Sequence, residues 1–101
     1  MPKHLISITE AAEQDLTKIV DYIKCDNPAA ALKLADNIER GILMLEDFPL
    51  TGTTPKNRRL TRQGYRILIV DSYLVFYVFL NNEMVEIRRI FSGRRDYQFL
   101  L

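Results

Sequence analysis

The stretch YRILIVDSYLVFYVFL, residues 65–80, decides how this chain folds. Residues 65–70 and 73–80 are two runs rich in aromatic, β-branched and other apolar residues, and such runs indicate strands. Asp71 and Ser72 separate the runs, which is the length of a tight hairpin turn. Because 73–80 is apolar on both faces, we expect this strand at the centre of a sheet, with helices covering one side.

The chain that follows this hairpin continues the sheet. Asn81-Asn82 predicts a second turn, because asparagine tolerates a positive φ. Apolar and charged residues alternate within 83–91, which indicates a third strand with one buried and one solvated face. Ser92-Gly93 ends the strand, and residues 94–101 form a short C-terminal tail.

The chain before the hairpin predicts a short strand, 4–8, and two amphipathic helices. Thr9 is placed to cap the first helix, while Asn27 and Pro28 start the second, over about 29–46. Both helices have apolar residues at helical spacing. These residues are Ala12, Leu16, Ile19, Val20 and Ile23 in the first helix, and Ala31, Leu34, Ala35, Ile38, Ile42 and Leu45 in the second. Two such helices with a short joint form an antiparallel hairpin.

The order of the expected elements gives the fold class. Residues 51–62 have no periodicity and contain Gly52 and Pro55, so we expect a loop there. The order is therefore β-α-α-β-β-β, an α+β fold with a helical hairpin packed on a small antiparallel sheet. A chain of 101 residues has room for one core, so we expect a single domain, 1–101.

Composition excludes several classes of protein. No apolar run approaches the ~20 residues of a membrane span, and the N-terminus lacks the apolar segment of a signal peptide. The single cysteine, Cys25, cannot form an internal disulfide, so we expect a cytoplasmic protein. We find no glycine-rich phosphate loop and no Cys/His cluster, and therefore predict no cofactor and no metal site.

Charge is unevenly distributed along the chain. Residues 1–50 carry five basic and nine acidic side chains, whereas residues 51–101 carry nine basic and four acidic ones. Five basic residues fall within 56–66, and a second group comprises Arg88, Arg89, Arg94 and Arg95, near Tyr97. We expect the meander to bring Arg66 and the arginines of 89–95 onto one surface. Guanidinium groups bind phosphate and tyrosine stacks on bases, so this surface fits RNA or DNA, and equally an acidic protein segment.

Three stretches carry a resemblance to a known family. Residues 65–77, YRILIVDSYLVFY, closely resemble the central hairpin of RelE/ParE toxins, and residues 85–97, VEIRRIFSGRRDY, resemble their last strand and its GRRD ending. The helical half is also similar, at NPAAA (27–31) and DFP (47–49). The resemblance covers nearly the whole chain and implies the toxin of a type II toxin–antitoxin system.

This resemblance implies particular partners. In the superfamily the C-terminal segment of a cognate antitoxin wraps the toxin, and the pair often represses its own operon. We therefore expect a toxin–antitoxin hetero-oligomer, with operator DNA bound through the antitoxin and no membrane partner. RelE-like members cut messenger RNA in the ribosome, and ParE-like members inhibit DNA gyrase.

The ribonuclease residues of the superfamily are only partly present. The resemblance assigns catalytic roles, in a ribonuclease, to Arg66, Arg95 and Tyr97. Leu68 and Leu74 stand where RelE-like toxins carry basic residues, and leucine can neither move a proton nor stabilise an anion. The tyrosine that RelE-like toxins carry in the C-terminal tail corresponds to about Leu101 in this sequence. Tyr97, four residues earlier, is the candidate to replace it.

These departures favour a toxin that binds gyrase. The alternatives are a ribosome-dependent messenger-RNA endoribonuclease and an inert relative that only binds an antitoxin. The residues expected to contact the target or nucleic acid are Arg58, Arg59, Arg62, Arg89 and Arg94.

Overall fold

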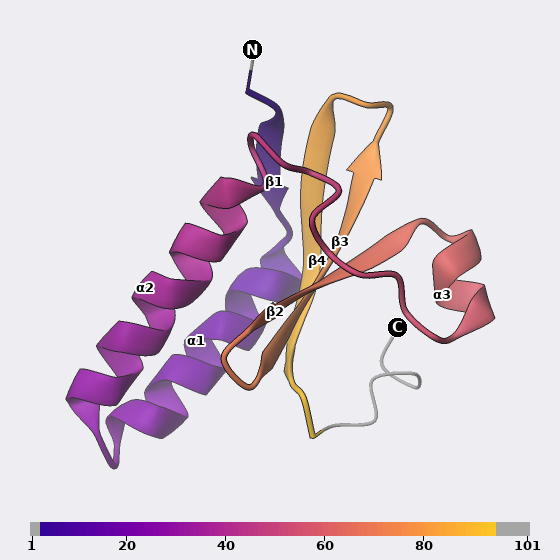
Figure 1. The fold of residues 1–101 in the computed structure, drawn as a ribbon. Coiled ribbons are helices and arrows are strands. Elements are labelled where there is room, and N and C mark those ends of the chain that lie inside the picture. Colours follow the sequence, from indigo (N-terminus) through magenta and orange to yellow (C-terminus); the bar gives the residue numbers. More distant parts are fainter. Residues whose placement is uncertain (1–2, 95–101) are drawn as a thin grey trace.

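The computed structural model describes residues 3–94, which form three helices and four strands (Figure 1). The elements are β1 (Leu5–Ile8), α1 (Glu10–Lys24), α2 (Pro28–Met44), α3 (Arg58–Arg62), β2 (Tyr65–Val70), β3 (Tyr73–Leu80) and β4 (Met84–Ser92). The expected strands and the helical hairpin are confirmed. The expectation of a loop throughout 51–62 is wrong, because α3 lies within it. The expected tail lies mostly outside the described residues.

Local capping explains where the two long helices begin. The side chain of Thr9 accepts a hydrogen bond from the Ala12 N–H, and that of Asn27 accepts one from the Ala30 N–H. Each bond satisfies a backbone donor that has no partner within its helix. Pro28 occupies the first turn of α2, as the sequence predicts.

The sheet is mixed rather than purely antiparallel. Its strand order is β1-β4-β3-β2, and β1 pairs with β4 in parallel, whereas the other pairs are antiparallel. The helical hairpin carries the chain from β1 across to the far edge of the sheet, so that β4 returns beside β1. Asp71, Asn81 and Asn82 adopt positive φ angles of 54°, 53° and 56° in the two turns of the meander. The antiparallel expectation is therefore corrected for β1 alone.

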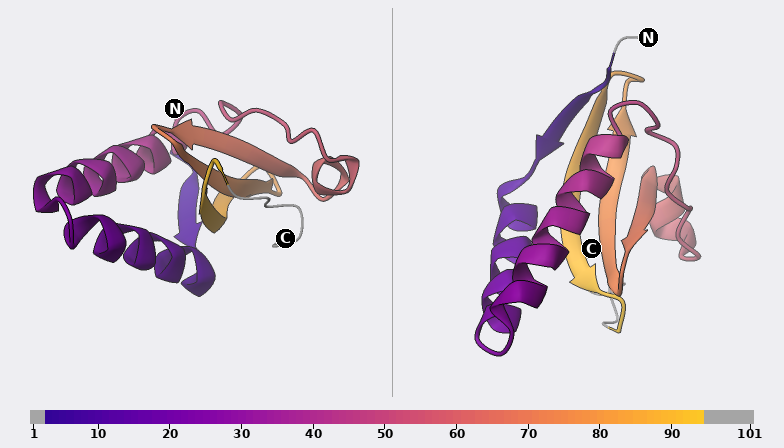
Figure 2. Two further views of the ribbon diagram at one scale, coloured as in Figure 1. Left: turned by 90° about the horizontal axis from the view of Figure 1, so that it is seen from below. Right: turned by 60° about the vertical axis from the view of Figure 1, so that its left-hand side comes forward.

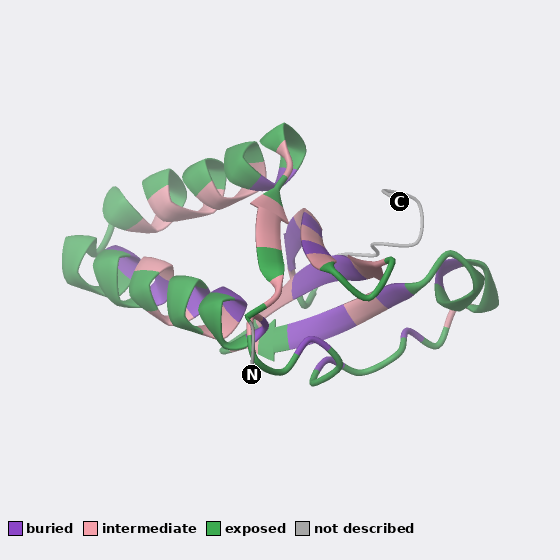
Figure 3. Cartoon of the chain, turned by 90° about the horizontal axis from the view of Figure 1, so that it is seen from above, coloured by how far each residue is buried: buried purple, intermediate pink, exposed green. Residues whose placement is uncertain are grey.

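The two faces of the sheet carry separate apolar clusters. Helices α1 and α2 lie together on one face, and α3 lies beyond the start of β2 (Figures 1 and 2). The helix-side core consists of Ala12, Leu34, Ile38, Ile42, Leu45, Leu68, Val75, Tyr77, Val85, Ile87 and Ile90. The outer-face core consists of Leu60, Tyr65, Ile67, Phe76, Val78 and Phe91. Buried positions form one stripe on α2 and occupy the middle of β3 (Figure 3), which confirms β3 as the central covered strand.

Candidate functional site

Arg66 on β2 fastens the loop that precedes α3. Its Nη1 donates hydrogen bonds to the carbonyl oxygens of Gly52, at 2.9 Å, and Leu50, at 3.3 Å. The backbones of Thr53 and Ile67 also exchange two hydrogen bonds, which tie the same loop to the edge of β2. This guanidinium is therefore engaged in holding the protein's own backbone.

Tyr77 holds the same loop from inside the core. Its buried hydroxyl donates to the Pro49 carbonyl oxygen at 2.8 Å and accepts from the Gly52 N–H at 2.9 Å. Burial raises the pKa of Tyr77 above its ordinary value, while the Gly52 hydrogen bond and the charge of Arg66 act in the opposite direction. The neutral phenol therefore persists as a structural hydrogen-bonding group.

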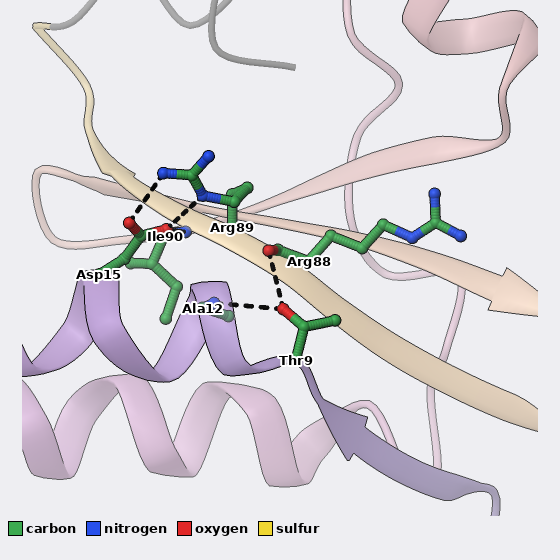
Figure 4. A network of polar contacts seen from close by, with 6 residues as sticks. All are labelled: Thr9, Ala12, Asp15, Arg88, Arg89 and Ile90. Atoms are coloured by element: carbon green, nitrogen blue, oxygen red, sulfur yellow. Dashed lines mark hydrogen bonds and ion pairs between the residues drawn. The ribbon is translucent and has the colours of Figure 1, made fainter.

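Arg89 joins β4 to α1 through the carboxylate of Asp15 (Figure 4). Its Nε and Nη2 donate to the two carboxylate oxygens at 2.7 and 3.0 Å, and the Ile90 N–H donates to Oδ2 at 3.0 Å. Strand β1 pairs with β4 only as far as Ile87, so Asp15 takes the place of a neighbouring strand beyond that point. The hydrogen bond to Asp15 raises the pKa of Arg89 further above its ordinary value.

Arg88 lies on the outer face of the sheet. Its Nε donates to a carboxylate oxygen of Glu86 at 2.8 Å, and its guanidinium carbon lies 5.5 Å from the centroid of the Tyr65 ring. Hydrogen bonding to Tyr65, followed by that to Glu86, raises the pKa of Arg88. The Thr9 hydroxyl donates to the Arg88 carbonyl oxygen at 3.0 Å and thereby joins the cap of α1 to β4 (Figure 4).

Arg66 does not share a surface with Arg89, so that part of the expectation is wrong. Tyr65 and Ile67 pack in the outer-face core, and alternation along the strand turns Arg66 to the helix side. Arg89 instead lies 4.7 Å from the ring centroid of Phe91, in the outer-face core. Arg66 and Arg89 therefore lie on opposite faces of the sheet.

The two ends of the sheet separate the remaining arginines. β2 and β4 each run antiparallel to β3, so they start at the same end. α3 precedes the start of β2, whereas Arg94 follows the end of β4, where the Gly93 N–H bonds to the Ser72 carbonyl oxygen. Arg94 and α3 are consequently at opposite ends of the sheet.

α3 is the densest basic element of the described chain. Arg58, Arg59 and Arg62 are exposed on it, and exposed Lys56 precedes it. The side chain of Asn57 caps the helix by accepting from the Leu60 N–H, and the Thr61 hydroxyl donates to the Pro55 carbonyl oxygen at 2.7 Å. Leu60 is fully buried and fixes the helix on the outer-face core.

The expected catalytic set is only partly described by the structure. Arg95 and Tyr97 lie outside the described residues, so their assignment stays a prediction. Leu68 packs in the helix-side core and Leu74 against the outer-face core, so neither faces a shared reaction centre. Their opposite orientations follow from register, because Leu68 pairs with Val75 and Ile69 with Leu74.

Two structurally important residues were missed by sequence reasoning. Asp15 lies on the edge of the apolar stripe of α1, three residues after Ala12, and this position was a readable signal for a partner on the sheet. Tyr77 is the one polar-tipped residue in the middle of an apolar strand, which predicts a buried hydroxyl with partners. The identity of those partners depends on long-range folding and was not readable.

Apolar surface also remains exposed. A groove of about 320 Å³ lies between α1, the start of β3 and the end of β4, beside Asp15, Tyr22, Tyr73 and Ser92. Tyr22 is 83% exposed there, and Ile69 on the edge strand β2 is 63% exposed. Within residues 3–94, no helix is long and apolar enough to span a membrane, and no group of His, Cys, Asp and Glu side chains could hold a metal ion.

Comparison with known proteins gives one matching family model and solved structures with a similar fold. The family model for the ParE toxin of the type II toxin–antitoxin system parDE matches residues 6–97. The fold is similar to a chain of the chromosomal ParDE system from P. aeruginosa, with a TM-score of 0.72 and 20% identity, over 89% of this chain and 96% of that one. It is also similar to a chain of the RelBE2 toxin–antitoxin complex from Mycobacterium tuberculosis, with a TM-score of 0.57 and 21% identity, over 91% of this chain and 99% of that one. No curated protein matches the chain.

Proposed function

The chain belongs to the ParE toxin family of type II toxin–antitoxin systems, and from this premise we propose that it arrests growth by binding DNA gyrase. The observation that carries the proposal is that, within the described residues, the sheet lacks free basic side chains at the positions where RelE-like ribonucleases have catalytic residues. Arg66 holds backbone carbonyls, and leucines occupy positions 68 and 74. Acid–base cleavage of RNA needs groups that transfer protons or stabilise charge at the reaction centre. A protein-binding inhibitor needs none of them.

We also propose a cognate antitoxin as the partner that neutralises the toxin. Exposed apolar side chains on a domain of this size favour a covering protein. They lie on α1 at Tyr22, on β2 at Ile69 and in the 48–50 segment. Binding of operator DNA through the antitoxin belongs to the same proposal, since both structural neighbours come from toxin–antitoxin systems.

A paired assay tests the proposed target. Purified toxin is added to DNA gyrase in a supercoiling reaction, and in parallel to ribosomes translating a defined message. We expect loss of supercoiling at stoichiometric toxin and no new message ends by primer extension. New ends together with unaffected supercoiling would establish the ribonuclease alternative, and activity in neither assay would favour an inert antitoxin-binding relative.

Substitution of Tyr97 by phenylalanine sharpens the comparison. The change preserves ring area but removes a hydroxyl able to handle a proton. Inhibition of gyrase should therefore persist in Tyr97→Phe. Loss of message cleavage in the same variant would show instead that the tyrosine serves catalysis.

A further inference from the structure

α3 and the residue before it form a positive element that the fold leaves exposed, here called the α3 knob (residues 56–62). Lys56, Arg58 and Arg62 are exposed, and no carboxylate of the described residues lies within the 4 Å of an ion pair from them. In contrast, Arg88 and Arg89 each have a carboxylate partner. Lys56, Arg58 and Arg62 therefore remain available to an outside anion, whereas Arg88 and Arg89 do not.

Arg58 does not serve the stability of α3, although Arg59 and Arg62 lie in its last turn, where positive charge is favourable. Arg58 and Arg62 are four residues apart, and like charges at this spacing destabilise a helix by about 0.2–0.5 kcal/mol. Arg58 also lies in the first turn, where a positive charge is unfavourable. The helix is held instead by the Asn57 cap, the hydroxyl of Thr61 and the burial of Leu60. Binding of an external ligand therefore explains the positive charge of Arg58 better than stabilisation of α3 does.

The knob lacks the apolar centre of a protein-binding surface. Among the described residues, the exposed large hydrophobic side chains all lie outside 51–68; they are Leu5, Ile8, Tyr22, Leu32, Leu43, Met44, Phe48, Leu50 and Ile69. Protein interfaces concentrate their binding energy in buried aromatic and apolar anchors. Phosphate backbones require only cations, because affinity comes from the release of counterions. The composition of the knob therefore fits a nucleic acid better than a protein segment.

The rest of the molecule orients a polyanion towards the knob. Residues 10–47, which contain the helical hairpin, carry nine acidic and four basic side chains, whereas 56–66 carry five basic and no acidic ones. The hairpin and α3 lie on opposite sides of the sheet (Figures 1 and 2). Such a separation of charge attracts a polyanion at one side and repels it at the other.

We infer that the α3 knob binds the phosphate backbone of duplex DNA, without reading its sequence, through Lys56, Arg58 and Arg62. The inference rests on the proposed function, because gyrase holds duplex DNA and a toxin docked on gyrase would meet it. Contacts to phosphate position a protein on DNA but carry no sequence information. The toxin would then favour gyrase engaged on DNA over the free enzyme.

The test measures DNA binding in the absence of gyrase. Fluorescence anisotropy with a labelled 30-base-pair duplex gives affinity between 50 and 200 mM salt. Arg58→Gln/Arg62→Gln is compared with Lys24→Gln/Lys33→Gln, which removes the same charge from exposed positions of the hairpin. We expect the knob variant to bind roughly tenfold more weakly at 100 mM salt, with the slope of log K against log salt reduced by about 2. The hairpin variant should retain both values, and circular dichroism should show both variants folded.

Other results overturn the inference. Equal loss in the two variants would mean that net charge alone governs binding. Tighter binding of single-stranded RNA of the same length would assign the knob to RNA, and tighter binding of a polyglutamate peptide would assign it to an acidic protein. Gyrase inhibition is measured separately. Retained inhibition without DNA binding removes this inference alone, whereas DNA binding without inhibition removes the proposed function alone.

Discussion

The carboxylate of Asp15 on α1 receives both hydrogen bonds of the Arg89 guanidinium on β4, at 2.7 and 3.0 Å. The same carboxylate accepts the Ile90 N–H, where β4 has run past the end of β1. The Asp15 side chain thus accepts a backbone hydrogen bond that a neighbouring strand would otherwise accept, and it also neutralises the charge of Arg89. The helical hairpin is fixed to the sheet by a charged contact as well as by its apolar stripe.

Removing this carboxylate should destabilise the fold. Asp15→Asn leaves a partly buried guanidinium without its counter-charge, and we expect the free energy of unfolding in urea to fall by about 1–3 kcal/mol. Adding Arg89→Gln should recover part of the loss, because the unpaired charge disappears with it. Asp36→Asn is the control, since its pair with Arg40 is exposed on α2 and should change stability by less than about 0.5 kcal/mol. Strictly additive effects of the two substitutions would show that Asp15 and Arg89 are not coupled.

The hydroxyl of Tyr77 should contribute at ordinary pH and lose that contribution in alkali. Tyr77→Phe leaves the Gly52 N–H and the Pro49 carbonyl without this partner in the core, at a cost of about 1–3 kcal/mol. Burial raises the pKa of Tyr77 above 10.0, so the native state keeps the proton that the unfolded state releases. Stability from this group is therefore complete below about pH 10 and declines as pH rises above it.

Urea unfolding between pH 8 and 11 checks this dependence. The unmodified protein should lose stability above about pH 10, and Tyr77→Phe should show a shallower decline. Tyr73→Phe is the matched control on the same strand, because it leaves the hydrogen bonds of Tyr77 to Pro49 and Gly52 in place. An equally steep decline in Tyr77→Phe would contradict the assignment.

Gly52 should not accept a side chain. A Cβ there would lie 2.6 Å from the Tyr77 hydroxyl oxygen and 2.9 Å from the Ile67 carbonyl oxygen. Gly52→Ala must therefore displace the loop or the tyrosine, at a cost of roughly 1–3 kcal/mol. Gly64→Ala separates crowding from backbone strain, because Gly64 has a φ of 85° and nothing within 4 Å of its Cβ position. It should cost about 1 kcal/mol, and a smaller loss at Gly52 than at Gly64 would contradict the prediction.

Much of the fold could be predicted because its signals are local. The Thr9 and Asn27 caps and the two-residue turn after Val70 depend on a few neighbouring residues. α3 was missed because five residues are too few for a helical period to be visible, and its anchor is Leu60 alone. The parallel pairing of β1 was missed because nothing within Leu5–Ile8 specifies its neighbour.

The arrangement of the arginines was less predictable. β2 is apolar on both faces, so its pattern does not reveal which face Arg66 shares. The irregular register near Phe76 lets Ile87 and Ile90, three residues apart, both enter the helix-side core. Simple alternation therefore does not give the faces of Arg88 and Arg89, which lie between them. The partner of Arg89 lies 74 residues away in sequence, at Asp15. Clustering in sequence therefore did not predict clustering in space.

Arg66 provides a test of whether a basic residue on the sheet acts on the target or on the fold. In Arg66→Gln the carbonyls of Leu50 and Gly52 lose their charged donor, so the loop before α3 should open more often. We expect faster hydrogen exchange at the Thr53 and Ile67 amides, which bond the loop to β2, and a loss of stability of about 0.5–1.5 kcal/mol. Growth arrest should persist, because the residue acts on its own backbone. Arg88→Gln, on the opposite face, should leave the exchange of both amides unchanged. Loss of growth arrest with unaltered exchange would show instead that Arg66 contacts the target, and would restore it to the catalytic set that the family resemblance implies.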